Sequence, residues 1–151
     1  MSNTFAQINL HIVFSVKYRD AILADEWREE LFRYMAGIIK NAGHTPIAIG
    51  GFRDHVHILA GCKPTVNIPG LVKDLKLATN QWIQQKCHHK FAWQDGYAVF
   101  SISKSHEKAV ANYILSQPQH HMHTTMVDEF KRLLTVNGVD YDDRYILHQP
   151  L

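Results

Sequence analysis

The spacing of apolar residues predicts four strands in this chain. Residues 4–17 alternate between polar and apolar side chains over the longest stretch, which predicts a long strand with one buried face. Residues 45–52 and 54–62 predict two more strands that join tightly around Arg53. Residues 97–103 (YAVFSIS) predict the fourth strand.

Between and after these strands, apolar residues recur at helical spacing. The expected helices run from Asp25 to Asn41, from Thr65 or Asn67 to Lys86, from Ser105 to Gln117, and over 125–135. Asp25 and Ser105 are the expected N-caps of the first and third helices, because short polar side chains accept hydrogen bonds from the first turn. Gly43 and Gly138 are the expected ends of the first and last helices.

The resulting order is β-α-β-β-α-β followed by C-terminal helices. This order predicts an α+β fold of the ferredoxin-like, split βαβ type. We expect a four-stranded antiparallel sheet with two helices on one face, plus the C-terminal helices, in a single domain over residues 1–151. Such a fold implies no function by itself, so function has to be argued from particular residues.

Composition narrows the classes of protein but does not select one. Apolar residues make up 46% and charged residues 20% of the 151 residues, with no stretch of membrane-span length. We expect no export signal and no membrane partner, and we expect Cys62 and Cys87 to be reduced in a cytoplasmic protein. The net charge is only +2, so a nucleic-acid partner would have to meet a local basic patch.

His55 and His57 are the first candidates for chemistry. Side chains two positions apart on a strand share a face, so this pair can offer two imidazoles to a metal ion. The pair is weak evidence alone, because the chain holds eleven histidines, and His121 and His123 form a second pair with the same spacing. The alternative reading is two partly buried, hydrogen-bonded histidines.

Tyr113 and Gln117 are the second pair. Residues four apart are neighbours on one face of a helix, although a tyrosine there can also simply pack inward. Together with His55 and His57, Gln117 could hold a divalent metal, and the phenol of Tyr113 could attack phosphorus beside it. This combination predicts DNA strand cleavage through a phosphotyrosine link. The neutral ligands would bind Mg²⁺ weakly, so we expect Mg²⁺ or Mn²⁺ to bind together with DNA.

Basic side chains are candidates for contact with the DNA backbone. Lys73 and Lys76 lie on one face of the second expected helix, and Arg19, Arg53 and Lys104 are further candidates. The alternative for each is an ordinary solvated surface charge.

At this point the chain resembles a known family, the single-tyrosine HUH transposases, which are small insertion-sequence transposases that act on single-stranded DNA. The resemblance runs essentially end to end. Its motifs are Lys17-Tyr18-Arg19, Asp54-His55-Val56-His57-Ile58-Leu59, Leu71-Val72-Lys73 with Leu75-Lys76, Trp93-Gln94-Asp95-Gly96-Tyr97, Phe100-Ser101-Ile102-Ser103-Lys104-Ser105, Tyr113-Ile114 with Gln117, His120-His121, and Asp128-Glu129.

The resemblance implies a role for each matching residue. Tyr113 would be the nucleophile, leaving a 5′-phosphotyrosine and a free 3′-hydroxyl. His55, His57 and Gln117 would be the metal ligands. The implied substrate is single-stranded DNA with hairpin ends. His120 and His121 match the pattern without an assignable chemistry.

The resemblance also implies a homodimer with shared active sites. The catalytic helix would dock against the partner subunit, although the sequence does not fix whether Tyr113 acts in its own subunit or across the dimer. The long first strand supports pairing between subunits, because an exposed, one-sided strand edge needs cover.

Two other functions stay open at this stage. One is a domesticated HUH nickase that binds palindromes without moving its own gene. The other is a nucleic-acid-binding module without chemistry, in which the histidines are structural. The DNA ends, the hairpin sequence, the target site and the physiological metal do not follow from the sequence.

Overall fold

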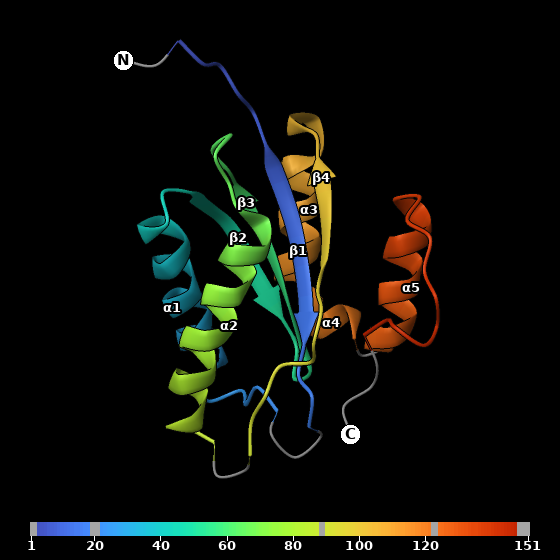
Figure 1. The fold of residues 1–151 in the computed structure, drawn as a ribbon. Helices are drawn as coiled ribbons and strands as arrows, with labels where there is room; N and C mark the ends of the chain where they lie inside the picture. The colour runs from blue at the N-terminus through green and yellow to red at the C-terminus, as the bar shows by residue number, and fades with distance from the viewer. Residues whose placement is uncertain (1–2, 19–21, 88–89, 122–123, 148–151) are drawn as a thin grey trace.

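The computed structural model has a four-stranded antiparallel sheet with the strand order β2-β3-β1-β4 (Figure 1). The strands are β1 Asn9–Ser15, β2 Thr45–Gly51, β3 His55–Gly61 and β4 Ala98–Ile102. The structure describes residues 3–18, 22–87, 90–121 and 124–147. The predicted α+β fold with a four-stranded antiparallel sheet is therefore confirmed.

Helices cover both faces of this sheet (Figure 1). The helices are α1 Arg28–Asn41, α2 Ile68–Gln84, α3 Glu107–Leu115, α4 Gln117–His120 and α5 Met126–Val136. Figure 1 shows α1 and α2 in front of the sheet and α3 behind it. We call the face that α3, α4 and α5 cover the site face. Among the described residues, the structure has no helix that is long and apolar enough to cross a membrane.

The first strand differs from the prediction in two ways. All seven residues of β1 are buried, because Ile12 and Phe14 face the α1/α2 core while Val13 packs with α5 on the site face. In addition, β1 lies between β3 and β4, so β2 and β4 are the edge strands. The expectation of a one-sided first strand with a free edge was wrong, because the polar positions that look solvent-facing in the sequence are buried under α3 and α5, and one of them, His11, contacts the site.

Helix starts were predicted less well than helix positions. Asn67 caps α2 as expected, accepting a hydrogen bond from the Gly70 amide at 3.0 Å. Asp25 instead lies in the turn before α1 and pairs with Arg28 at 2.9 Å. Ser105 lies in a 3₁₀ turn, and the N-cap of α3 is His106.

A glycine lets α3 lie directly on the sheet. A Cβ atom on Gly50 of β2 would stand only 2.2 Å from the carbonyl oxygen of Ile114 on α3. The Ile114 side chain is fully buried beside Ala48 and Leu59. This close contact holds α3 against β2, the neighbour of strand β3, which carries the two predicted histidines.

Candidate active site and metal centre

Strand β3 presents His55 and His57 together on the site face. Both side chains are fully buried, whereas Val56 and Ile58 between and beyond them belong to the opposite, α1/α2 core. The alternation predicted from the sequence is therefore present. Burial of two imidazoles requires hydrogen-bond partners, which the surrounding helices supply.

Tyr113 and Gln117 reach the same place from the other side. The helix breaks between them, since α3 ends at Leu115 and α4 begins at Gln117, but the Gln117 Nε2 still donates to the Tyr113 carbonyl at 3.5 Å. The buried Gln117 places its Oε1 2.9 Å from the Nε2 of His55. The ring centroids of Tyr113 and His57 are 5.7 Å apart. The structure thus brings all four predicted residues together within one chain.

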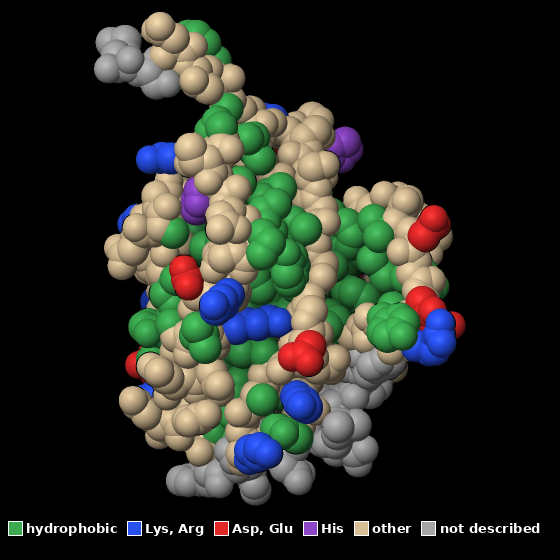
Figure 2. All heavy atoms as spheres, viewed as in Figure 1, with side chains coloured by type: hydrophobic (Ala, Val, Ile, Leu, Met, Phe, Trp, Pro, Cys, Tyr) green, Lys and Arg blue, Asp and Glu red, His purple; other side chains and the backbone are tan. Residues whose placement is uncertain are grey.

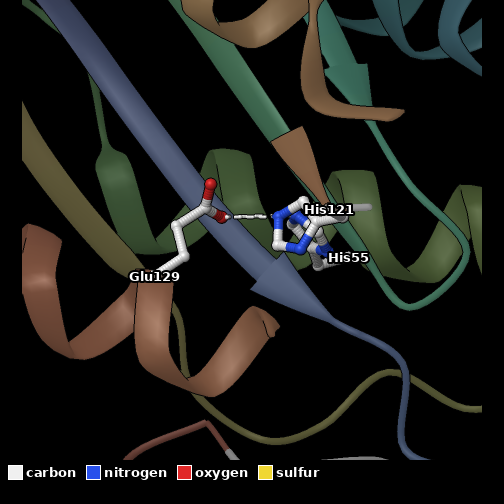
Figure 3. A group of neighbouring side chains, drawn as sticks. All are labelled: His55, His121 and Glu129. Atoms are coloured by element: carbon white, nitrogen blue, oxygen red, sulfur yellow. Dashed lines mark hydrogen bonds and ion pairs between the residues drawn. The ribbon is translucent and has the colours of Figure 1, made fainter. Parts of the chain in front are cut away.

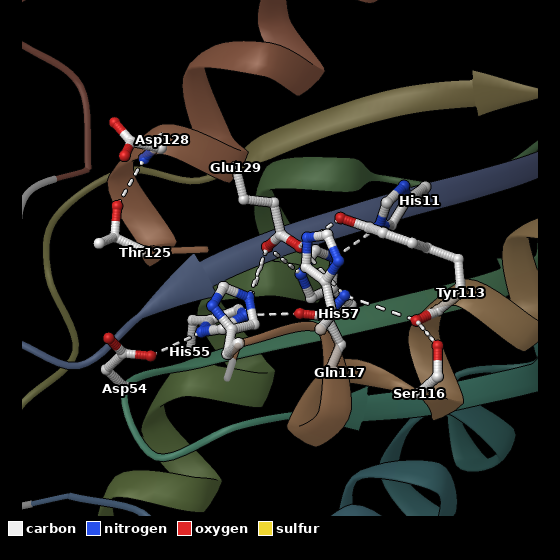
Figure 4. A network of polar contacts seen from close by, with 12 residues as sticks. His11, Asp54, His55, His57, Tyr113, Ser116, Gln117, Thr125, Asp128 and Glu129 are labelled. Atoms are coloured by element: carbon white, nitrogen blue, oxygen red, sulfur yellow. Dashed lines mark hydrogen bonds and ion pairs between the residues drawn. The ribbon is translucent and has the colours of Figure 1, made fainter. Parts of the chain in front are cut away.

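The centre of the site is occupied by a residue to which the sequence analysis gave no role. Glu129 of α5 is only 4% exposed, and its Oε1 lies 3.0 Å from the His57 Nε2. Its Oε2 accepts hydrogen bonds from the Tyr113 hydroxyl and, at 3.1 Å, from the Gln117 Nε2. Figure 4 shows this carboxylate between the imidazoles and the phenol.

Three more histidines join the cluster, and one of them, His120, places its Nε2 3.2 Å from the Glu129 Oε2. His121 places its Nε2 3.1 Å from the Glu129 Oε1, and its ring stacks on Phe52 at a centroid distance of 6.0 Å. His11 of β1 places its Nε2 2.8 Å from the Nδ1 of His57. His11 was missed because its face of the first strand was read as solvent-exposed, and His121 because only its place in a motif marked it.

The electrostatics of the site centre on His55. Its Nδ1 donates to the Asp54 carboxylate at 2.7 Å, and its Nε2 faces the oxygens of Gln117 and Glu129. Burial disfavours a charged imidazole, but the hydrogen bonds to Asp54 and Glu129 outweigh it and raise the pKa of His55 to about 9. These two carboxylates therefore favour the protonated form of His55.

The pKa values of the neighbouring groups are shifted as well. Burial and the nearby His55 lower the pKa of His57 to about 4, and burial and His57 lower the pKa of His11 to about 3. Burial would raise the pKa of Glu129, but hydrogen bonds from His121, His55 and His57 hold it well below its usual range. The carboxylate form of Glu129 is therefore favoured beside a His57 that resists protonation. Burial and contact with Glu129 raise the pKa of Tyr113.

These groups form a donor set for a divalent metal. One ligand atom each from His55, His121 and Glu129 lies within 4.8 Å of the others (Figure 3). Two further side chains border this group: His57 contacts Glu129, and Gln117 contacts His55. Imidazole nitrogens and carboxylate or amide oxygens are suitable ligands for several divalent metals.

Two of the basic residues predicted to contact DNA lie far from the site, on the opposite face of the sheet. Lys76 is half-buried and donates to the carbonyls of Gln94 and Gly96 at 2.8 and 2.7 Å, and burial lowers its pKa. It and the exposed Lys73 lie on α2, across the sheet from the site. Figure 2 shows that on this side Lys and Arg side chains are interspersed with Asp and Glu side chains.

The remaining three basic candidates differ in their relation to the site. Arg53 is exposed in the β2–β3 turn, directly before Asp54 and His55. Lys104 is exposed and pairs with Glu107 at 2.7 Å. Arg19 lies outside the described residues.

The chain is similar to a known protein family. Residues 4–117 match the model of a family described as IS200-like transposases. The ISDra2 transposase TnpA of Deinococcus radiodurans is 28% identical over 118 residues, covering 74% of this chain and 84% of that protein.

Two solved structures share the fold. A crystal structure of a protein from Deinococcus radiodurans R1, assigned as a transposase, matches with a TM-score of 0.62 and 26% identity over 76% of this chain and 93% of that one. A REP-associated tyrosine transposase bound to a REP hairpin matches with a TM-score of 0.59 over 100% of this chain and 99% of that one, at 13% identity.

Proposed function

The chain belongs to the IS200-like transposase family, and we propose that it cleaves and rejoins single-stranded DNA through a covalent bond to Tyr113. The observation that carries this proposal is the position of the Tyr113 side chain, with its ring beside His57 and its hydroxyl bonded to Glu129. A phenol held against a cluster of metal-binding side chains is suited to attack on a phosphodiester.

In the proposed step the oxygen of Tyr113 forms a bond to phosphorus and loses its proton. The bond from phosphorus to the 3′ oxygen breaks, which leaves a 5′-phosphotyrosine and a free 3′-hydroxyl. Because one phosphodiester replaces another, a later attack by a 3′-hydroxyl on the phosphotyrosine can rejoin DNA without another energy source. Before the reaction, Glu129 holds the Tyr113 hydroxyl at the edge of the histidine cluster.

We propose that His55, His57 and Gln117 hold a divalent metal, Mg²⁺ or Mn²⁺. The chain fits such a group, because the Nδ1 atoms of His55 and His57 have partners in Asp54 and His11, the arrangement that orients metal-bound histidines. His55 would present Nε2 after losing its proton there, and His57 after its proton moves to Nδ1. When bound, the metal would polarise the scissile phosphate and neutralise developing charge.

The proposed substrate is single-stranded DNA with a hairpin near the cleavage point, in the cytoplasm. The REP-associated relative is bound to a hairpin, which supports the same substrate class for this chain. Arg53 is the best placed of the predicted backbone contacts, because it is exposed one residue before Asp54. Lys76 is the least suited, because backbone carbonyls already bind its ammonium group.

We also propose that the protein acts as a homodimer, which would bring two DNA ends to one assembly. The support comes from β4, which pairs only with β1 among the described strands and so offers a free edge. The expected sharing of sites differs from what one chain shows here, since its own Tyr113 and Gln117 lie beside its own histidines.

The test is incubation with labelled single-stranded oligonucleotides from the flanks of the gene, followed by a denaturing gel. The proposal predicts a divalent-metal-dependent band that migrates as protein joined to DNA. A hairpin complex that never becomes covalent would contradict it and favour the non-catalytic binding module. Flanking hairpins and element copy number separate a mobile element from a domesticated nickase.

A further inference from the structure

Three imidazoles, not two, meet at one carboxylate oxygen. The Glu129 Oε1 lies 3.0 Å from the Nε2 of His57, 3.1 Å from that of His121 and 3.4 Å from that of His55. A metal ion bound by His55 and His57 would lie near the same three nitrogens. The sequence pattern accounts for His55 and His57 but leaves His121 and Glu129 without a role.

The helix that carries Glu129 is held by contacts that do not involve the imidazoles. Helix α5 is anchored by Met126, Phe130 and Leu134, which pack with Phe100 and other buried residues of the site face. The helix also begins at a capped position, Thr125. An apolar core therefore holds this charged side chain in a buried place, which is costly unless the charge has partners of opposite sign or a metal.

His121 is also held by contacts outside the cluster. Its ring stacks on Phe52 with an interplanar angle of 13° and meets the His55 ring edge-on at 4.4 Å. Its backbone amide donates to the Gln117 carbonyl at 3.0 Å, which ties it to the end of α4. Its side chain is 3% exposed, so its Nε2 is directed into the site and not toward solvent.

We propose that Glu129 and His121 are further ligands of the metal that His55, His57 and Gln117 bind, so that the chain takes up a transition metal before it meets DNA. This inference rests on the metal site of the proposed function. Two imidazoles and an amide form a neutral ligand set that binds a divalent metal weakly, so that DNA would have to complete the coordination shell. A third imidazole and a buried carboxylate supply negative charge and nitrogen ligands, which favour Mn²⁺ or Co²⁺ over Mg²⁺.

The two oxygens of Glu129 would then serve different partners. Oε1 faces the imidazoles of His55, His57 and His121. Oε2 accepts the hydrogen bond of Tyr113 and also lies 3.2 Å from the His120 Nε2. Ligation through Oε1 leaves Oε2 available to the phenol. The same carboxylate would therefore connect the metal to the nucleophile.

The test measures Mn²⁺ binding to the full chain without DNA, by isothermal titration calorimetry. We expect one Mn²⁺ per chain for the wild type, and affinity at least about tenfold weaker for Glu129→Gln and for His121→Ala. Asp128→Asn is the matched control. It removes an exposed carboxylate from the position directly before Glu129 in α5, and it should bind Mn²⁺ like the wild type. Circular dichroism without metal identifies any variant that fails to fold, and each of the two site variants tests the proposal separately.

Wild-type affinity in both site variants would overturn the inference, as would tighter binding in Glu129→Gln, because the carboxylate would then only replace the metal in its absence. A wild type that binds no Mn²⁺ without DNA would overturn it as well. In each of these cases a DNA adduct at Tyr113 would leave the proposed function standing. Conversely, tenfold losses in the site variants without any DNA adduct would support the inference and remove the proposed function.

Discussion

Tyr113 lies among aromatic rings, and its hydroxyl has a carboxylate partner. Its ring meets the rings of His11, His57 and His120 edge-on at centroid distances of 6.4, 5.7 and 5.5 Å, and its hydroxyl donates to Glu129. The ring contacts position the side chain without the hydroxyl. The oxygen can therefore be removed for a test of chemistry while the packing stays.

Tyr113→Phe should abolish cleavage and covalent adduct while hairpin binding stays close to the wild-type level. The variant loses one hydrogen bond, whose net worth is about 1 kcal/mol, because Glu129 keeps its other donors. Cleavage on denaturing gels and hairpin binding by gel shift measure the two effects. An adduct in the Phe variant would transfer the role to another tyrosine, such as Tyr97 or Tyr141.

Metal identity gives a second prediction at the residue scale. Mn²⁺ should support cleavage at least as well as Mg²⁺, because imidazole ligands suit Mn²⁺ better, and Ca²⁺ should be poor in turnover. His57→Ala should lose cleavage with every metal. Cleavage rates across a metal series measure this, and full activity in excess chelator would rule out a metal-dependent reaction.

The site residues that could be predicted from the sequence are those that lie a fixed, short distance apart along one strand or helix. His55 and His57 are two apart on a strand, and Tyr113 and Gln117 are four apart near a helix end, so each pair follows from one periodicity. Glu129 meets His57 across 72 positions of sequence, and His11 meets it across 46. Such contacts depend on how elements stack on the sheet, which no local pattern encodes.

At the scale of elements, the position of α3 decides whether Tyr113 can reach the histidines. The helix lies on the sheet through the contact of Ile114 with Gly50, where no side chain intervenes. The strands and helices themselves were predictable from hydrophobic periodicity. The burial of both faces of β1 was not, because polar residues that line a site look in sequence like residues that face water.

Gly50→Ala should destabilise the protein by about 1–3 kcal/mol and reduce cleavage strongly, because the added methyl group forces α3 away from β2. The matched control is Gly37→Ala in the middle of α1, where among the described residues a Cβ would meet no atom within 4 Å. That change should stabilise the protein by about 0.4–1 kcal/mol. Thermal unfolding measures both, and wild-type cleavage by Gly50→Ala would show that α3 need not lie so close.

At the scale of the whole molecule, one chain provides every proposed catalytic and metal-binding residue. Tyr113, Gln117 and Glu129 reach the histidines of their own chain through α3, α4 and α5. A dimer joined along a sheet edge would then carry two complete sites. This differs from the crossed arrangement that the family resemblance favoured, since Tyr113 and Gln117 contact the histidines of their own β3.

Mixing two inactive variants distinguishes these arrangements. Tyr113→Phe protein and a His55→Ala/His57→Ala double variant should stay inactive when mixed, because in an uncrossed dimer every site lacks either the nucleophile or the histidines. Subunit exchange is verified separately with differently tagged chains. Recovery of cleavage in the mixed dimer would show that Tyr113 works in the partner's site.

If Tyr113 itself becomes joined to DNA, identification of the modified residue will show it. Wild-type protein is incubated with a single-stranded hairpin oligonucleotide and Mn²⁺, digested with nuclease and protease, and analysed by tandem mass spectrometry. We expect a nucleotide attached through a 5′ phosphate to Tyr113 in the peptide that spans α3. Modification of a different residue, or cleaved DNA with no modified peptide, would contradict this expectation.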